Sequence, residues 1–415
     1  MSTLADDVPA FRVTTREIAP ATSLLPLLDA RHPLVFVRRG EGVAGLGEAL
    51  RLEFSGPDRF REAAAAWKRI AAAASIEDPI RRSGSGLVAF GAFAFDDASA
   101  RASVLIVPRV VIGRRDGVTW TTTIETPGEP LVEPRLAAAP LGDEYRIALH
   151  PGRLDGEGYR AAVGAAVERI EAGEVRKVVV ARDLEGRLPE GGDLRRVLME
   201  LALGYPDTWS FAVDGLIGSS PETLVRVKGG QVSARVLAGS IARGSDAEAD
   251  HAAAVALATS TKDLDEHRFA VRSVLQALEP HARTLAGSEI PFTLKLPNLW
   301  HLASDVEGTL GDGSTALDLV GELHPTAAVA GTPTDAALTL IHELEPFDRQ
   351  RYGGAVGWVD AAGDGKWAIA LRSAEVAEDG RITAFAGAGI VAGSDPDQEL
   401  AETKLKFRPV VEAFG

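Results

Sequence analysis

Two pairs of acidic residues have the spacing of a metal site built on helices. Asp263 and Glu266 lie three residues apart in one segment, and Glu399 and Glu402 lie three apart in another. Residues at i and i+3 share a helix face, so each pair would present two carboxylates on one side. Facing each other, the pairs would form an all-oxygen site that suits Mg²⁺ better than zinc. Either pair alone also fits a solvated helix surface, and acids near a helix N-terminus are stabilising without any metal.

Lys177 and Glu222 are candidates for proton transfer. Lys177 opens the apolar segment Lys-Val-Val-Val-Ala-Arg, and Glu222 stands in Gly-Ser-Ser-Pro-Glu-Thr, just after an apolar strand. A lysine acts as a base only where burial or nearby positive charge removes its proton. A half-buried carboxyl can instead keep its proton and donate it. The plainer interpretations are a solvated strand end for the lysine and a turn residue for the glutamate.

Arg372 and Lys406 are candidates for binding an anion. Arg372 interrupts the apolar segment Trp367–Ala374, where an unpaired guanidinium is costly and a carboxylate matches its planar fork. An internal ion pair would satisfy it equally well. Lys406 is one helical turn beyond Glu402, so an i,i+4 ion pair is its simplest explanation. The strand end at Gly387–Gly389 lets backbone N–H groups approach a ligand, but its spacing is not a dinucleotide fingerprint.

Composition limits the classes of protein that these residues can serve. The chain has 415 residues, no cysteine and a formal net charge of -15. Disulfides, thiolate metal sites and cysteine nucleophiles are therefore excluded, and general attraction to nucleic acid or to anionic membranes is disfavoured. The N-terminus has acids where a signal peptide has a basic region, and no apolar run is long enough to span a bilayer. We expect a soluble, cytoplasmic protein.

The elements that must position these side chains follow an α+β pattern, with large antiparallel β-sheets and surrounding helices. They do not alternate as β-α-β units. The predicted strands are Leu34–Val37, Leu87–Phe95, Val104–Ile112, Val118–Thr123, Val178–Ala181, Ser210–Ile217, Thr223–Val227, Val232–Leu237, Ala355–Val359, Lys366–Val376 and Arg381–Ile390. The predicted helices are Phe60–Ala74, a segment from Tyr159 to Ile170, Lys262–Leu278, and a final helix with Asp395 as N-cap and Pro396 in its first turn.

Taken together, the motifs resemble the chorismate-utilising enzymes, and within them the isochorismate synthases. The resemblance covers residues 158–415, while residues 1–150 are less diagnostic and are assigned to the same fold by continuity. The segments that carry it are Lys-Val-Val-Val-Ala-Arg (177–182), Ser-Pro-Glu (220–222), Leu-Ala-Gly-Ser (237–240), Lys-Asp-Leu-Asp-Glu-His (262–267), Leu-Trp-His-Leu (299–302), Glu-Leu-His-Pro-Thr (322–326), Glu-Leu-Glu-Pro-Phe-Asp-Arg (343–349), Tyr-Gly-Gly-Ala-Val-Gly (352–357), Phe-Ala-Gly-Ala-Gly-Ile-Val (385–391) and Glu-Leu-Ala-Glu-Thr-Lys-Leu-Lys (399–406).

The resemblance implies a single domain over residues 1–415 and a Mg²⁺-dependent conversion of chorismate to isochorismate. Water adds at ring C2, the double bonds shift and the C4 hydroxyl leaves. By similarity, Lys177 is the base that activates the water and Glu222 is the acid that protonates the leaving hydroxyl. The metal set, again by similarity, is Glu266 and Glu402 as Mg²⁺ ligands, with Asp263 and Glu399 holding bound waters.

The substrate carries two carboxylates, which an acidic pocket alone would repel. A divalent cation that bridges the acidic cluster to the ring carboxylate removes this conflict. Arg372 is then left for the enolpyruvyl carboxylate. By resemblance, the remaining substrate contacts are Tyr352, Lys406 and the backbone of Gly387, Ala388 and Gly389 at that end, with Gly239, Ser240 and His301 along the ring.

Other members of the family are separated by single positions. Anthranilate synthases use ammonia and lack Lys177, and aminodeoxychorismate synthases carry a lysine where this chain has Ala238. Salicylate synthase, which makes isochorismate and then eliminates pyruvate, is the alternative that shares the motifs. Ala328, where salicylate-forming enzymes tend to have threonine, favours stopping at isochorismate, whereas Tyr352 slightly favours the alternative. We expect a monomer without an amidotransferase subunit, feeding menaquinone or siderophore biosynthesis.

Overall fold

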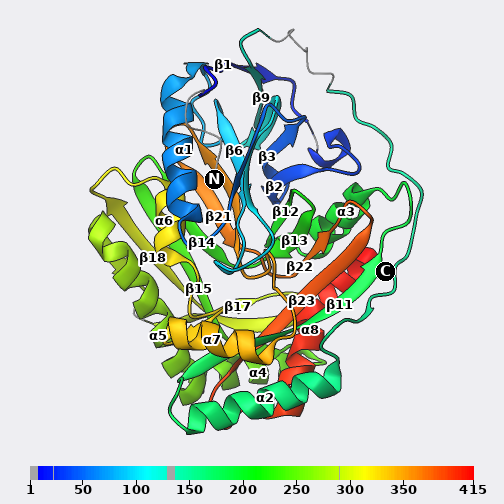
Figure 1. The fold of residues 1–415 in the computed structure, drawn as a ribbon, viewed down its shortest axis with the longest axis vertical. Coiled ribbons are helices and arrows are strands. Elements are labelled where there is room, and N and C mark those ends of the chain that lie inside the picture. Colours follow the sequence, from blue (N-terminus) through cyan, green and yellow to red (C-terminus); the bar gives the residue numbers. More distant parts are fainter. Residues whose placement is uncertain (1–7, 22, 129–135, 289) are drawn as a thin grey trace.

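The fold consists of two large β-sheets with helices packed around them (Figure 1). The computed structural model describes residues 8–21, 23–128, 136–288 and 290–415. Within these residues one sheet has 13 strands and the other has 10. Every pairing in the described residues is antiparallel except that of β1 with β5. The predicted α+β class, with large antiparallel sheets, is therefore confirmed.

The strands of the first sheet are β1 (Arg12–Ile18), β2 (Leu34–Arg38), β3 (Glu41–Leu46), β5 (Ser75–Glu77), β8 (Val110–Arg115), β9 (Val118–Glu125), β10 (His150–Pro151), β11 (Lys177–Arg187), β12 (Trp209–Val213), β13 (Leu216–Ser220), β19 (Gly331–Thr332), β22 (Ser373–Val376) and β23 (Arg381–Ile390). The second sheet contains β4 (Leu50–Phe54), β6 (Val88–Ala92), β7 (Ser103–Val107), β14 (Thr223–Lys228), β15 (Gln231–Ala242), β16 (Ala282–Gly287), β17 (Phe292–Lys295), β18 (Leu299–Leu310), β20 (Ala355–Asp360) and β21 (Gly365–Ile369).

Inner faces of the two sheets share one apolar core, in which Phe36 and Phe211 of the first sheet join Trp358 and Trp367 of the second. The helices are α1 (Arg59–Ala73), α2 (Gly156–Glu171), α3 (Leu194–Gly204), α4 (Ala247–Thr259), α5 (Thr261–Leu278), α6 (Ala316–Leu323), α7 (Thr334–Leu344) and α8 (Pro396–Phe414). Helix α5 packs on β15 and β18, and α8 packs on β23 (Figure 1). No helix of the described residues is long and apolar enough to cross a membrane.

Three predicted strands are wrong because each contains a break. Val104–Ile112 is divided at Pro108, where β7 of one sheet ends and β8 of the other begins. Ser210–Ile217 is the hairpin of β12 and β13, with Asp214 and Gly215 at positive φ in its turn. Lys366–Val376 crosses from β21 in one sheet to β22 in the other. Two of the three breaks are places where the chain passes from one sheet to the other, and the third is a turn within one sheet.

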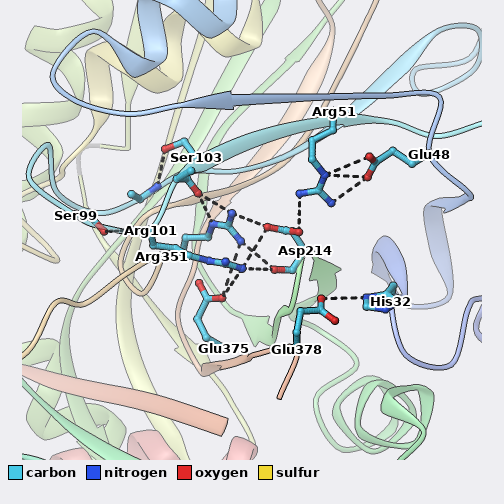
Figure 2. A network of polar contacts seen from close by, with 12 residues as sticks. His32, Glu48, Arg51, Ser99, Arg101, Ser103, Asp214, Arg351, Glu375 and Glu378 are labelled. Atoms are coloured by element: carbon cyan, nitrogen blue, oxygen red, sulfur yellow. Dashed lines mark hydrogen bonds and ion pairs between the residues drawn. The ribbon is translucent and has the colours of Figure 1, made fainter. Parts of the chain in front are cut away.

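Residues before and after position 150 are joined in both sheets. Strand β2 pairs with β12, and β6 pairs with β20. The hairpin turn at Asp214 adds polar contacts between the same parts of the chain (Figure 2). Its carboxylate accepts hydrogen bonds from Arg51 and Arg351, each at 2.8 Å, and from Arg101 at 3.3 Å. Arg101 also lies 3.6 Å from Glu375, so N-terminal strands are held to the remaining sheet by charge as well as by backbone pairing.

Candidate active site

A cavity of about 360 Å³ opens where β11, β15 and β23 meet helices α5 and α8. Its volume lies within the range of sites for small molecules. Fifteen of the sixteen residues predicted from the sequence line it: Lys177, Glu222, Gly239, Ser240, Asp263, Glu266, His301, Ala328, Tyr352, Arg372, Gly387, Gly389, Glu399, Glu402 and Lys406. Residues from far-separated segments therefore share one cavity, although their chemical roles remain predictions.

Helix starts bring the two acidic pairs to the cavity. Ser260 caps α5, with its hydroxyl oxygen accepting a hydrogen bond from the backbone N–H of Asp263 at 3.3 Å. Asp395 caps α8 by accepting from the backbone N–H groups of Asp397 and Gln398 at 3.0 and 2.9 Å. The predicted N-cap and the proline that follows it are thus confirmed. Both acidic pairs lie within the first two turns of their helices, which point into the same space.

Two lysines are bound to two of the predicted metal ligands. Nζ of Lys177 lies 2.6 Å from Oε1 of Glu266, and Nζ of Lys406 lies 2.6 Å from Oε1 of Glu402. Burial alone would raise the pKa of Glu402, but Lys406 and a hydrogen bond from Ser240 outweigh it and lower that pKa. Glu402 is therefore held as a carboxylate in a largely buried place.

The acidic set fits a hard cation in its chemistry. Carboxylate oxygens from two helices are the donors that Mg²⁺ prefers, and Mg²⁺ commonly takes only one or two carboxylates plus water and substrate oxygens. Among the described residues no three acids or histidines stand close enough together to hold a metal by themselves. A hard cation at this place would need water or ligand oxygens beside the carboxylates to complete its coordination.

Glu222 occupies the short link between β13 and β14, and the residue is only 5% exposed. Burial raises the pKa of Glu222 to about 8, against the opposing influence of a backbone hydrogen bond from Leu237 and of Lys177, Arg372 and Lys406. At neutral pH this carboxyl is mostly protonated. It has the protonation state that a general acid needs, as in other buried catalytic carboxyls.

Arg372 lies at the crossing from β21 to β22, with φ at 51° and its side chain buried. Burial lowers the pKa of its guanidinium, partly countered by Tyr352, Glu402 and Glu222. Its side chain forms no hydrogen bond or ion pair with another described residue, so the internal ion pair considered from the sequence is not formed. A cation that is buried, unpaired and open to a cavity is suited to an anionic ligand.

His301 provides a neutral wall to the cavity. Burial, together with Arg372 and Lys406, lowers the pKa of His301 to about 3. Its Nε2 atom is buried without a hydrogen-bond partner among the described residues. A neutral imidazole facing the cavity can hydrogen-bond a hydroxyl or carbonyl of a ligand without adding charge.

Glycines at two positions keep the cavity open. Gly239 has φ at 84°, and a Cβ there would lie 3.2 Å from the side chain of Asp263. A Cβ at Gly389 would lie 2.8 Å from Cε and 3.3 Å from Nζ of Lys177. A methyl group at either position would push a predicted site residue out of place, which explains why the strands carry glycine here.

Ala388 was predicted to contact substrate, and it does not line the cavity. Side chains alternate along a strand, so its methyl group turns into the apolar core between its two glycine neighbours. Gln398 lines the cavity but was missed. Gln398, Glu402 and Lys406 follow each other at intervals of four residues, which places all three on one helix face, a signal that was readable. The missed apolar wall is Val179, Pro221, Leu237, Ala238, Ile241, Val329 and Leu371, which sequence patterns do not separate from ordinary core.

Comparison with known proteins identifies the family of enzymes to which this fold and cavity belong. The family model described as chorismate binding enzyme matches residues 17–415. The chain belongs to this family.

Similar proteins of this family carry related names. The chain is 39% identical over 337 residues to isochorismate synthase DhbC of Bacillus subtilis, covering 78% of this chain and 80% of that protein. It is 33% identical over 401 residues to the salicylate biosynthesis isochorismate synthase of Pseudomonas aeruginosa, covering 89% and 82%. The solved structure of MenF, the menaquinone-specific isochorismate synthase of Escherichia coli, superposes with a TM-score of 0.79 at 25% identity, covering 98% of this chain and 96% of that one.

Proposed function

We propose that this protein is an isochorismate synthase that converts chorismate to isochorismate. The observation that carries the proposal is the shared cavity, in which an amine, a protonated buried carboxyl, an unpaired guanidinium and two acidic pairs converge. Family membership and the names of the similar proteins support the same activity.

In the proposed mechanism, Lys177 and Glu222 move the two protons of the reaction. The amine of Lys177 accepts a proton from water as the water oxygen bonds to ring C2. The ring double bonds shift, and the C4–O bond breaks as Glu222 donates its proton to the departing hydroxyl, which leaves as water. One molecule of water enters and one leaves, so substrate and product are isomers. The buried, protonated state of Glu222 supports its role as the donor.

Lys177 reaches this role from an ion pair with Glu266. While that pair is intact, the amine is held as a hydrogen-bond donor and is not available as a base. Glu266 is also a proposed ligand of Mg²⁺, so Lys177 and the cation would share its carboxylate. We infer that binding of substrate releases Lys177 from this pair and leaves its amine free to accept a proton.

The two substrate carboxylates find different partners. Arg372, which has no hydrogen-bonded or ion-paired partner among the described residues, would bind the enolpyruvyl carboxylate with its planar fork. Tyr352 lies at the same end, buried and stacked on Phe385 with ring centroids 5.6 Å apart. Glu266 and Glu402 would hold Mg²⁺, with Asp263 and Glu399 binding its waters. When bound, this ion supplies positive charge that binds and orients the ring carboxylate.

Isochorismate, not salicylate, is the proposed final product. Ala328 lines the cavity and carries no hydroxyl where salicylate-forming enzymes tend to have threonine. Because water is the proposed nucleophile, no amidotransferase subunit is needed to supply ammonia. We also propose that the protein is a monomer. Size-exclusion chromatography with light scattering would show a mass near 43.7 kDa for the active species.

Product analysis tests the proposal. Purified protein is incubated with chorismate and Mg²⁺, and the products are separated by chromatography. Accumulation of isochorismate without pyruvate is expected. Salicylate and pyruvate in equal amounts would identify the enzyme as a salicylate synthase. Unchanged chorismate at high protein concentration would overturn the assignment of the protein as an enzyme that converts chorismate.

A further inference from the structure

Four basic side chains gather outside the catalytic cavity, and we call them the cation cluster: Arg38, Arg115, Arg226 and Lys366. They come from the strands β2, β8, β14 and β21, two from each sheet. None of them lines the catalytic cavity. Successive members are separated in the sequence by between 77 and 140 positions, so only the packing of the two sheets brings them together.

Direct contacts place two members of the cluster, Arg38 and Lys366, against one indole ring. The guanidinium of Arg38 lies 5.4 Å and Nζ of Lys366 lies 5.1 Å from the ring centroid of Trp209. Arg226 is the direct cross-strand partner of Lys366. Arg115 adds repulsion, since it is the largest charged influence on Lys366. Like charges that face each other across a sheet destabilise it.

The members of the cluster lack directly bound counter-charges. None of the four forms a side-chain hydrogen bond or ion pair with another described residue, and the Nε atoms of Arg38 and Arg226 are buried without a hydrogen-bond partner in that part of the chain. Trp209 attracts two of the cations through its ring face. A ring face, however, does not satisfy the N–H groups of two guanidinium forks.

Glu41 and Asp116 attract Arg115, and Asp364 interacts with Arg226, but none of these acids is hydrogen-bonded to a cluster member. Two further acids near the cluster already bind other cations. Asp207 binds Arg39, with its Oδ1 atom 2.7 Å from Nε. Asp305 binds Arg235 through two hydrogen bonds of 2.6 and 2.8 Å. The acids that exert an attraction on Arg38 are these same two residues. The four cations of the cluster are therefore left without a directly bound acid among the described residues.

The excess positive charge affects the protonation of the cluster itself. Burial, with Arg115, Arg226 and Arg38, lowers the pKa of Lys366 to about 7. Burial and Arg226 likewise lower the pKa of Arg115. A neighbouring anion would remove this repulsion. Arg38, Arg226 and Lys366 are only partly buried, so solutes can approach the cluster from outside.

We propose that the cation cluster is a binding site for a multiply charged phosphoryl anion, either inorganic or carried by a small metabolite. Three guanidinium groups and an ammonium present more donors and more charge than one carboxylate can use. A phosphoryl group carries close to two negative charges and three acceptor oxygens, and guanidinium forks bind it in bidentate fashion. Nucleic acid is a poor occupant, because the chain has a net charge of -15 and the cluster is confined to four residues.

Thermal unfolding in defined anions tests this site with the full-length protein. The wild type, Arg226→Met, Lys366→Met and the control Arg61→Met are melted in chloride, phosphate, pyrophosphate and citrate at equal ionic strength. Arg61 is an exposed helical arginine whose carboxylate partner is Asp58. Pyrophosphate is expected to raise the Tm of the wild type and of the control by a few degrees over chloride. Neither cluster variant should show this rise, and both should equal or exceed the wild type in chloride.

Other outcomes count against the site. An equal pyrophosphate effect in all four proteins would place binding elsewhere. A lower Tm of both cluster variants in chloride, with no anion effect on the wild type, would mean that the fold itself satisfies these cations. A rise with citrate alone would overturn the phosphoryl assignment. Equilibrium dialysis with ³²P-labelled pyrophosphate should give one bound anion per wild-type chain and a loss of at least about ten-fold in affinity for Lys366→Met. Because neither variant touches the catalytic cavity, turnover of chorismate in chloride should be unchanged, which separates this test from that of the proposed function.

Discussion

The two lysines of the catalytic cavity and the members of the cation cluster differ in how their charges are partnered. In the cavity, Lys177 and Lys406 are each bound to a glutamate, and those same glutamates are the proposed metal ligands. In the cluster, Lys366 and its three arginine neighbours have no such partners among the described residues. Ion pairs that a metal or substrate can rearrange suit a site that changes during a reaction. Unpaired charge of one sign is better suited to holding a single, constant kind of ligand.

Removing the proposed acid should have the largest effect. Glu222→Gln keeps the shape of the side chain but cannot donate the proton, so kcat should fall by about 10²- to 10⁴-fold with little change in KM. Steady-state kinetics with chorismate provide the measurement. The matched control is Glu375→Gln, which alters another buried glutamate away from the cavity and should keep wild-type kcat. Equal losses in both variants would indicate general damage and not a catalytic role.

Two partly buried lysines, one in each region, permit the sharpest contrast between the regions. Lys177→Met should abolish water activation, with kcat falling by at least about 100-fold while chorismate still binds. Lys366→Met should leave kcat unchanged and increase the free energy of unfolding in chloride by on the order of 0.5–1 kcal/mol, because it removes a like-charge contact. Kinetics and urea unfolding of both variants check the pair. Normal turnover by Lys177→Met would refute its assignment as the base.

Much of the site was readable because its residues fall in distinct motifs. Lys177 opens β11 as predicted, and the acids on α5 and α8 follow helix starts with clear caps. The position of Arg372 was less readable. It was placed within a continuous strand, whereas it lies in a crossing between sheets with no glycine or proline to mark it. The break occurs because the segment passes from one sheet to the other, and this depends on the tertiary fold and not on the local sequence.

The turn at Asp214 could have been found, since Asp-Gly between apolar residues is a common hairpin signal. The cation cluster could not. Each of its members looks like an ordinary charged residue near a strand end, and their convergence depends on which strands of two sheets become neighbours. Ala388 shows the same limit on a smaller scale, because motif membership did not tell which face of the strand its side chain takes.

Weakening the metal ligands should produce a smaller loss that added metal reverses. Glu402→Gln removes one charged oxygen donor, so the Mg²⁺ concentration for half-maximal activity should rise by about ten-fold or more, with activity partly restored at high Mg²⁺. Glu412→Gln, on an exposed part of the same helix, is the control. An unchanged Mg²⁺ titration for Glu402→Gln would mean that this residue only pairs with Lys406.

The pH dependence of kcat/KM should show the titration of Glu222, and this is the smallest of the expected effects. Glu222 is protonated below its pKa of about 8 and loses its proton above it, so log kcat/KM should fall by about one per pH unit on the alkaline side. In the residual activity of Glu222→Gln this limb should be absent. The sign for stability is also fixed. The pKa of the folded state exceeds the ordinary value of 4.5, so burial of Glu222 becomes increasingly unfavourable between pH 4.5 and 8. Glu222→Gln should therefore be more stable than the wild type at pH 8, as measured by urea unfolding.

Isotope transfer from solvent tests the central claim most directly. A single turnover of chorismate with Mg²⁺ in H₂¹⁸O, followed by mass spectrometry, should give isochorismate that is two mass units heavier, with the label on the C2 hydroxyl. Incorporation should disappear together with turnover in Lys177→Met. Isochorismate that forms without the heavy oxygen would show that the original hydroxyl migrates, and it would contradict activation of water by Lys177.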